Sequence, residues 1–184
     1  ILYSDFIKEL KCYVKKEILK RTKISKKEFE KRALAIAISS IKYSMLKQDV
    51  SKPIIFNKEE SLSFEGNTGP YLLYTYARAR SILKKSKKKI PQKIFPKKIS
   101  DLEKNLLVQL NYFPEAIIQA YNSLSPNVIA NYAFQIAQTF NEFYHSFPVI
   151  DSDEEEFRLV LVDSFSQVLK NALNLLGIQT IENM

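Results

Sequence analysis

Apolar side chains recur at every third or fourth position over most of the chain, the spacing that places them on one face of an α-helix. This pattern predicts a first helix over about residues 3–20 and a second over about residues 25–46, which a capping signal opens. A third helix is expected over residues 71–85, because Pro70 suits a first turn, where its missing N–H costs nothing. The connector 48–64 contains one short extended piece at most.

The second half of the chain carries the same helical period. Capping boxes at residues 100–103 and 152–155 open two of its helices, and the Ser-Pro pair at 125–126 opens another. Pro114 is expected to kink or break the helix that begins at residue 100, and Gly177 is expected to end the last one. Strand patterns are nearly absent, so the sequence predicts an all-α helical bundle.

Composition and charge limit the classes of protein to which this bundle can belong. At 184 residues with 46% hydrophobic content, the chain is long enough for one packed domain, alone or with a helical extension. Only three glycines are present, too few for tight-turned all-β folds and for glycine-cradled nucleotide sites. A net charge of +8 fits a polyanionic partner, although charge alone does not separate nucleic acid from an anionic membrane.

Residues that could carry chemistry are few. Cys12 is the single cysteine, which leaves no intramolecular disulfide and favours a reduced, cytoplasmic setting. No apolar run approaches the length of a membrane span, so no membrane partner is expected. His145 is the only histidine, without a nucleophile pattern or a phosphate-binding loop beside it. The acidic run 151–156 fits the capping of a helix better than a metal site, so we expect no catalytic and no metal-binding residue.

The most informative stretch is residues 65–80, with the sequence EGNTGPYLLYTYARAR. Tyr71, Tyr74 and Arg78 recur there at spacings of three and four, so they share one face of the predicted helix. Phenol rings stack on unpaired bases and guanidinium groups bind phosphates, which indicates single-stranded RNA as the partner. Two plainer interpretations stay open: tyrosines at this spacing more often pack in a core, and the lysine-rich loop 84–98 is more often solvated surface.

The segment 140–144, with the sequence FNEFY, is interpreted as a core seam that faces neighbouring helices. Asn141 is the odd member of that seam. Because a buried amide is costly unless it is hydrogen-bonded, we expect Asn141 to cap or bridge the end of a backbone segment.

Several short motifs stand in a fixed order along the chain: FEGNTGPYLLY at 64–74, Ala77-Arg78, FPE at 113–115, IANY at 129–132, FNEFY at 140–144 and LLGI at 175–178. In this order and spacing they resemble the anticodon-binding region of arginyl-tRNA synthetases, the helical domain named after the Asp-Ala-Leu-Arg motif. The resemblance spans nearly the whole chain.

The resemblance implies a class I enzyme that joins arginine to its tRNA with ATP and Mg²⁺, on a catalytic domain whose signature sequences are absent here. This chain is then expected to be the tRNA-binding C-terminal portion of a longer, cytoplasmic and monomeric protein, with no cofactor of its own. Residues 1–64 are expected to form a helical connector after the catalytic domain, and residues 65–184 the anticodon-binding helical bundle. The implied partner is arginine-specific tRNA and not DNA.

By position, the resemblance implies that the loop 64–69 moves when tRNA docks, and that the RNA-binding residues are Asn67, Tyr71, Tyr74, Arg78 and Met184. The sequence departs from the family at Leu73, where glutamine is frequent, and at residues 129–132, which lack the arginine of the namesake motif. Two alternatives stand beside it. One is a helical protein-interaction module whose basic loop binds an acidic partner. The other is a related anticodon-binding domain from cysteinyl- or glycyl-type enzymes, but the segment 66–74 argues against it.

Overall fold

The computed structural model describes residues 7–12, 25–88, 90–91 and 93–182, and within these ranges every regular element is a helix. The elements are α2 (Lys26–Leu46), α3 (Lys58–Ser61), α4 (Gly69–Lys85), α5 (Asp101–Asn111), α6 (Phe113–Ser123), α7 (Asn127–Ser146) and α8 (Glu155–Leu175). The prediction of an all-α bundle is confirmed. Of the first predicted helix, residues 7–12 are described and are helical, and the rest lies outside the described residues.

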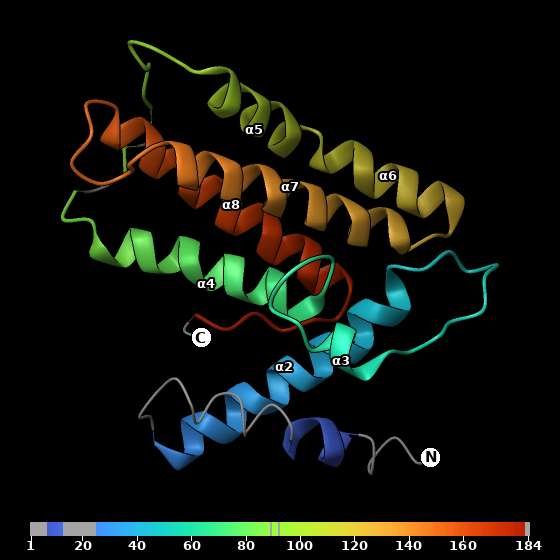
Figure 1. Cartoon of the computed structure of the whole chain (residues 1–184). Coiled ribbons are helices and arrows are strands. Elements are labelled where there is room, and N and C mark those ends of the chain that lie inside the picture. Colours follow the sequence, from blue (N-terminus) through green and yellow to red (C-terminus); the bar gives the residue numbers. More distant parts are fainter. Residues whose placement is uncertain (1–6, 13–24, 89, 92, 183–184) are drawn as a thin grey trace.

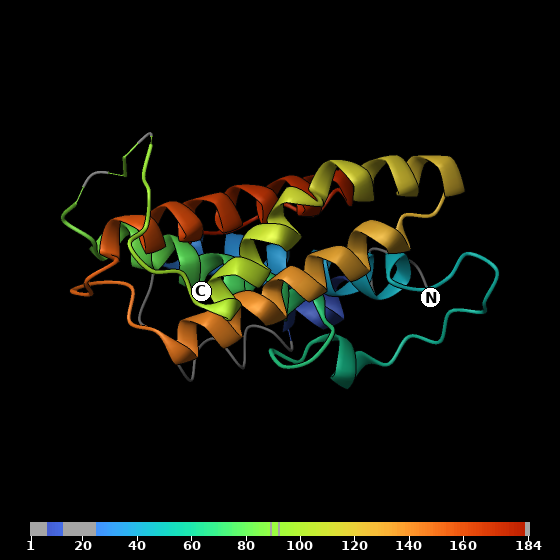
Figure 2. The same ribbon diagram turned by 90° about the horizontal axis from the view of Figure 1, so that it is seen from above.

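Three long helices, α4, α7 and α8, form the centre of the bundle (Figure 1). α4 packs on both α7 and α8, and α2 packs against α4 from the opposite side. α5 and α6 follow one another along the outer side of α7, and in the view from above they run along α7 and at an angle to α8 (Figure 2). The core lies where the three long helices meet, with Leu72, Phe140 and Phe165 among its fully buried side chains.

Local signals in the sequence fix several helix ends as predicted. Ser100 and Glu103 form both halves of a capping box at the start of α5. The helix is interrupted at Tyr112, which ends α5 and precedes α6, and Pro114 lies in the first turn of α6. Gly177 follows α8 with a φ of +65°, the left-handed conformation in which a glycine commonly ends a helix.

The proline rule holds at the start of α4 but not at the start of α7. α4 begins at Gly69, with the Thr68 side chain as its cap and Pro70 in its first turn, as predicted. α7 begins at Asn127, one residue later than expected, because Pro126 itself takes the N-cap position and its carbonyl oxygen accepts the first helical bond.

The start of α8 differs from the prediction, and the capping box at Ser152 is wrong. The Ser152 hydroxyl donates to the Val149 carbonyl oxygen (3.0 Å) instead of capping the helix. Glu155 turns its carboxylate back, accepts a hydrogen bond from the Asp151 N–H (3.3 Å) and pairs with Lys88 (3.3 Å). The ion pair ties the acidic segment to the distant lysine-rich loop, a contact that no local pattern encodes.

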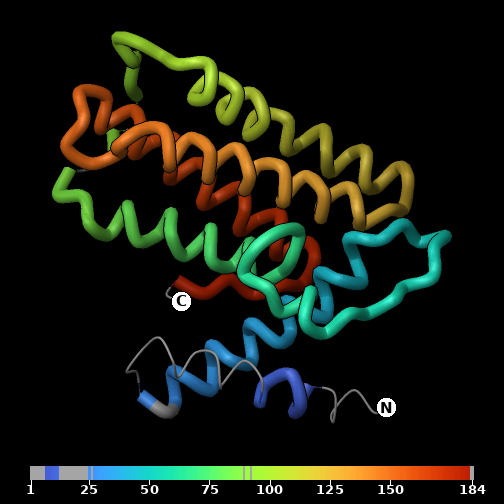
Figure 3. The backbone as a smooth tube through the Cα atoms, viewed as in Figure 1, coloured from blue at the N-terminus to red at the C-terminus, as the bar shows by residue number. Residues whose placement is uncertain are grey.

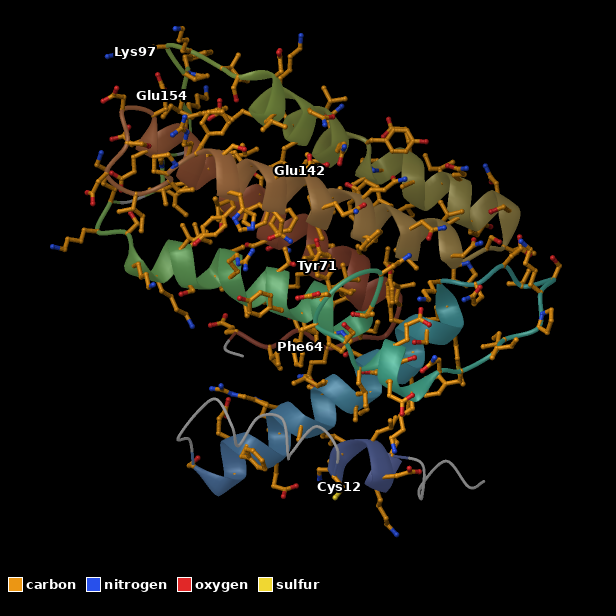
Figure 4. All side chains as sticks on the ribbon, in the orientation of Figure 1. Cys12, Phe64, Tyr71, Lys97, Glu142 and Glu154 are labelled. Carbon is orange, nitrogen blue, oxygen red and sulfur yellow. The ribbon has the colours of Figure 1, made fainter. Side chains whose placement is uncertain are left out.

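The connections between the helices lie at two ends of the bundle. The backbone tube shows the 47–57 connection as a wide loop at one end, and the lysine-rich connection after α4 at the other, beside the turn between α7 and α8 (Figure 3). Lys97 and Glu154 lie at this second end (Figure 4). The lysine-rich connection and the acidic turn before α8 therefore lie at the same end of the bundle.

Two glycines flank the turn into α4 for different reasons. Gly66 has a φ of +76°, which favours glycine, and a Cβ added there meets nothing within 4 Å. At Gly69 an added Cβ would lie 2.4 Å from the carbonyl oxygen of Ser39 in α2. Gly69 is thus the residue that lets the first turn of α4 approach the backbone of α2.

Gly69→Ala is expected to lower the free energy of unfolding by about 1–3 kcal/mol, because the added methyl group forces α4 away from α2. Gly66→Asn is the matched control and is expected to change stability little, since asparagine tolerates a left-handed φ and the site is open. Urea denaturation of both variants measures the difference. Equal stability of Gly69→Ala and the wild type would show that this close approach contributes nothing.

Candidate nucleic-acid interface

An open cleft of about 760 Å³ lies between the C-terminal part of α4 and the C-terminal end of α7. Its wall on α4 includes Tyr74, Arg78 and Lys85, and its wall on α7 includes Tyr144 and His145. Tyr74 is 40% exposed, so its ring faces the cleft and is not sealed in the core. An accessible surface that combines aromatic rings with cationic side chains is the kind that binds single-stranded nucleic acid.

Arg78 is the centre of this interface. The Cζ atom of its guanidinium lies 4.8 Å from the ring centroid of Tyr74 and 5.1 Å from that of Tyr144, both within cation–π distance. Nη2 donates to the Tyr74 hydroxyl (3.1 Å), and Nη1 donates to Oδ1 of Asn141 (2.6 Å). The guanidinium is therefore held in one orientation at the cleft, with further N–H groups left to bind an anion.

Tyr71 joins the same face but is more enclosed than Tyr74. It lies where α4 faces α7 (Figure 4), and its ring meets Phe134 edge-on at 5.7 Å between centroids. Its hydroxyl accepts a hydrogen bond from Nδ2 of Asn141 (2.8 Å). The predicted spacing of Tyr71, Tyr74 and Arg78 does bring the three polar ends together: Arg78 bonds Tyr74 directly and is joined to Tyr71 through the side chain of Asn141.

Asn67 lies in the turn before α4, where α2 holds it. Oδ1 of Asn67 lies 2.6 Å from the Tyr43 hydroxyl, whose single proton is shared with the carbonyl oxygen of Ala130 at 2.9 Å. Lys47 donates to the Asn67 carbonyl oxygen (2.9 Å). Burial raises the pKa of the Tyr43 hydroxyl, so it stays a hydrogen-bond donor at neutral pH. These contacts fix the turn against α2 and α7.

Met184 lies outside the described residues, but the chain that leads to it follows α4. Ile181 is buried, and Glu182 pairs with Lys84 (2.6 Å) and with Arg80 (3.5 Å). Glu182 also lines the cleft. Arg80 does not line the cleft, and its partners are acidic side chains of the protein itself.

Two residues of the interface come from the segment 140–144, whose sequence pattern predicted a place in the core. Phe140 and Phe143 are fully buried, as expected, but Tyr144 is 37% exposed and stands beside Arg78. Asn141 does not bridge a backbone end; it bridges the side chains of Arg78 and Tyr71. The sequence signal for this role was a single amide side chain between aromatic residues of the predicted helix.

Aromatic contacts connect the core to this surface. The rings of Phe140 and Phe165 are stacked with centroids 3.9 Å apart, and Phe140 also stacks on Tyr144 at 6.5 Å. Arg78 lies over the ring of Tyr144 and over that of Tyr74, so the contacts reach the surface. Tyr144 therefore packs on the buried pair of phenylalanine rings, which joins the interface to the core.

The described residues offer little to other kinds of site. Within them no helix is long and apolar enough to cross a bilayer, and no three His, Cys, Asp or Glu side chains gather as ligands for a metal ion. In the acidic segment, Glu155 is engaged by Lys88 and the Ser86 hydroxyl (both 3.3 Å).

Known proteins match the chain along its length. Its sequence is 37% identical to an arginine–tRNA ligase of Clostridium acetobutylicum, over 100% of this chain and 33% of the relative, and 35% identical to one of Parabacteroides distasonis, over 93% and 30%. The arginyl-tRNA synthetase of Thermus thermophilus has the same fold, with a TM-score of 0.90 and 32% identity over 100% of this chain and 32% of that one. The chain thus spans about a third of the length of these relatives.

The family model of the DALR anticodon binding domain matches residues 72–184. This range holds α4 from its first turn onward, all of α5 to α8, and both walls of the cleft. The resemblance inferred from the motifs is confirmed, and the chain belongs to the family of DALR anticodon-binding domains.

Proposed function

We propose that the chain is the tRNA-binding part of an arginine–tRNA ligase and that it grips the anticodon stem and loop. The observation that carries this proposal is Arg78, held between Tyr74 and Tyr144 at an open cleft. Rings of this kind stack on splayed bases, and a fixed guanidinium binds the adjoining phosphates. Relatives named arginine–tRNA ligases make arginine-specific tRNA the partner that best fits this surface.

The residues proposed to contact RNA are Asn67, Tyr71, Tyr74, Arg78 and Met184. The cleft position of Tyr74 and Arg78 supports a direct role for these two, and so does the exposure of Tyr74. The side-chain oxygen of Asn67 is engaged by Tyr43, so Asn67 is proposed to hold the turn before α4 in contact with the RNA. For Met184, support comes from the course of the chain at Glu182, which lines the cleft.

For the whole protein we propose arginine–tRNA ligase activity with ATP and Mg²⁺, in the cytoplasm, as a monomer. Residues 1–64 are proposed to connect a catalytic domain to the anticodon-binding bundle of residues 65–184. The start of the family match at residue 72 and the packing of α2 against α4 are compatible with this division. The bundle would then hold the anticodon while the 3′ end of the tRNA reaches the distant catalytic site.

The test is the binding of a labelled arginine anticodon stem-loop to the chain. The logarithm of the affinity is expected to fall linearly with the logarithm of the salt concentration, because phosphate contacts release counterions. Tyr74→Ala is expected to weaken binding about tenfold or more, since stacking on a base contributes about 1–3 kcal/mol. Because Tyr74 is 40% exposed, the melting temperature should barely change.

Tyr121→Ala provides the matched control. Tyr121 is 77% exposed on α6 and does not line the cleft, so its removal should leave RNA affinity unchanged. Equal affinity of the wild type for unrelated hairpins would reduce the interaction to charge attraction and overturn the proposal. A large loss of stability in Tyr74→Ala would instead place this ring in the core.

A further inference from the structure

The orientation of the Asn141 amide is fixed by its partners. A guanidinium only donates hydrogen bonds, so the atom that faces Nη1 of Arg78 at 2.6 Å must be the oxygen, Oδ1. Nδ2 then faces the Tyr71 hydroxyl at 2.8 Å and Oγ1 of Thr75 at 3.2 Å. The Thr75 hydroxyl donates its one proton to the Tyr71 carbonyl oxygen (2.9 Å), so toward Asn141 it can only accept.

This orientation determines where the phenolic protons point. The Tyr71 hydroxyl accepts from Nδ2 of Asn141, and the Tyr74 hydroxyl accepts from Nη2 of Arg78. A hydroxyl that accepts a hydrogen bond from a group that cannot accept in return must direct its own proton elsewhere. The proton of each phenol is therefore free to be donated to another group. The neighbouring guanidinium also only donates hydrogen bonds.

We propose that Asn141 is a positioning residue that leaves the phenolic protons of this surface free for a ligand, so that the surface favours the hydrogen-bond acceptors of an unstacked nucleotide. The inference rests on the proposed function and deepens it. The acceptor is a carbonyl oxygen or ring nitrogen on the edge of a base, or an oxygen of the adjoining phosphate. A base edge that presents an amino group instead would meet the hydroxyls and Arg78 donor to donor, which is costly.

The test is Asn141→Asp, which replaces the amide donor that faces the Tyr71 hydroxyl with an acceptor. A carboxylate still accepts from Arg78, so the ion pair retains the packing, but it offers no donor to Tyr71. The Tyr71 hydroxyl then turns and donates to the carboxylate, which withdraws its proton from the ligand. The affinity for the arginine anticodon stem-loop is expected to fall about tenfold, the loss of one hydrogen bond, with little change in melting temperature.

A double-mutant cycle with Tyr71→Phe separates this role from a merely structural or charge effect. In the wild type, Tyr71→Phe removes the phenolic donor and is expected to weaken binding about tenfold. In the Asn141→Asp background it is expected to cost less than about twofold, because that proton no longer reaches the RNA. Full additivity of the two losses would overturn the proposal.

Asn131→Asp is the matched control, since it adds the same charge at an exposed position of the same helix. It should change affinity less than about twofold, and a loss equal to that of Asn141→Asp would attribute the effect to charge alone. Melting temperatures measured in parallel show whether each variant is folded. Unfolding of Asn141→Asp would contradict the retained Arg78 pair.

Modified stem-loops identify the acceptor. If it belongs to a base, one abasic position in the loop abolishes the difference between the wild type and Tyr71→Phe; if it belongs to the backbone, one methylphosphonate does so. A difference that survives every modification would overturn the proposal. Wild-type binding that does not distinguish the arginine loop from other hairpins would defeat the proposed function itself, whereas specific binding with an additive cycle would defeat only this inference.

Discussion

Glu103→Ala is expected to lower the free energy of unfolding by about 3–5 kcal/mol, the cost of leaving one partner of a buried ion pair alone. The Glu103 side chain is 2% exposed and accepts a hydrogen bond from Nε of Arg158 (2.8 Å). Its carboxylate also accepts from the N–H (2.8 Å) and the hydroxyl (2.7 Å) of Ser100. Arg158 in turn donates to the Pro148 carbonyl oxygen (2.7 Å), so the pair joins α5, α8 and the turn after α7.

The same carboxylate makes stability depend on pH. Burial raises the pKa of Glu103, but the hydrogen bonds from Ser100 and Arg158 outweigh burial and leave its pKa below the ordinary value. A group whose pKa is lowered by folding stabilises the protein above its unfolded pKa, about 4.3, and loses this contribution as the pH falls through its folded pKa. The stability difference between wild type and Glu103→Ala should therefore be constant above about pH 5 and shrink in acid.

Urea denaturation between pH 3 and pH 7 measures both effects. Glu142→Ala is the matched control, because Glu142 is exposed on α7 and its loss should change stability by no more than about 0.5 kcal/mol. If Glu103→Ala unfolded with the stability of Glu142→Ala, the pair with Arg158 would contribute nothing beyond a surface contact.

Phe165→Ala is expected to lower the free energy of unfolding by about 3–5 kcal/mol, through lost burial and the cavity that remains. Its ring is fully buried and lies parallel to that of Phe140, with 3.9 Å between centroids and an interplanar angle of 2°. Because Phe140 also supports Tyr144, the cavity would open directly beneath the interface. Thermal and urea denaturation check the loss of stability.

Phe95→Ala tests whether this cost comes from burial rather than from the loss of a ring. Phe95 is 91% exposed in the loop before α5, and its removal should alter stability by no more than about 0.5 kcal/mol. A small effect of Phe165→Ala, comparable to that of Phe95→Ala, would mean that the stacked pair rearranges to fill the space.

The sequence predicted the helices well because their signals are local. The period of apolar residues, the capping box at Ser100, the first-turn prolines at Pro70 and Pro114 and the glycine after α8 act within about four residues. The error at Ser152 has the opposite cause. There Lys88, far away in the chain, engages Glu155 and removes it from the predicted capping pattern.

The candidate site divides in the same way. Tyr74 and Arg78 are one helical turn apart, so their contact follows from sequence spacing alone. Tyr144 and Asn141 approach Arg78 from α7, and Arg158 reaches Glu103 from α8. The sequence by itself determined the long helices but not α3 in the connector 48–64, and it determined the basic charge and the Tyr74–Arg78 pair. Only the tertiary structure decided which polar groups on different helices meet, because that depends on how the helices cross and not on any repeat along the chain.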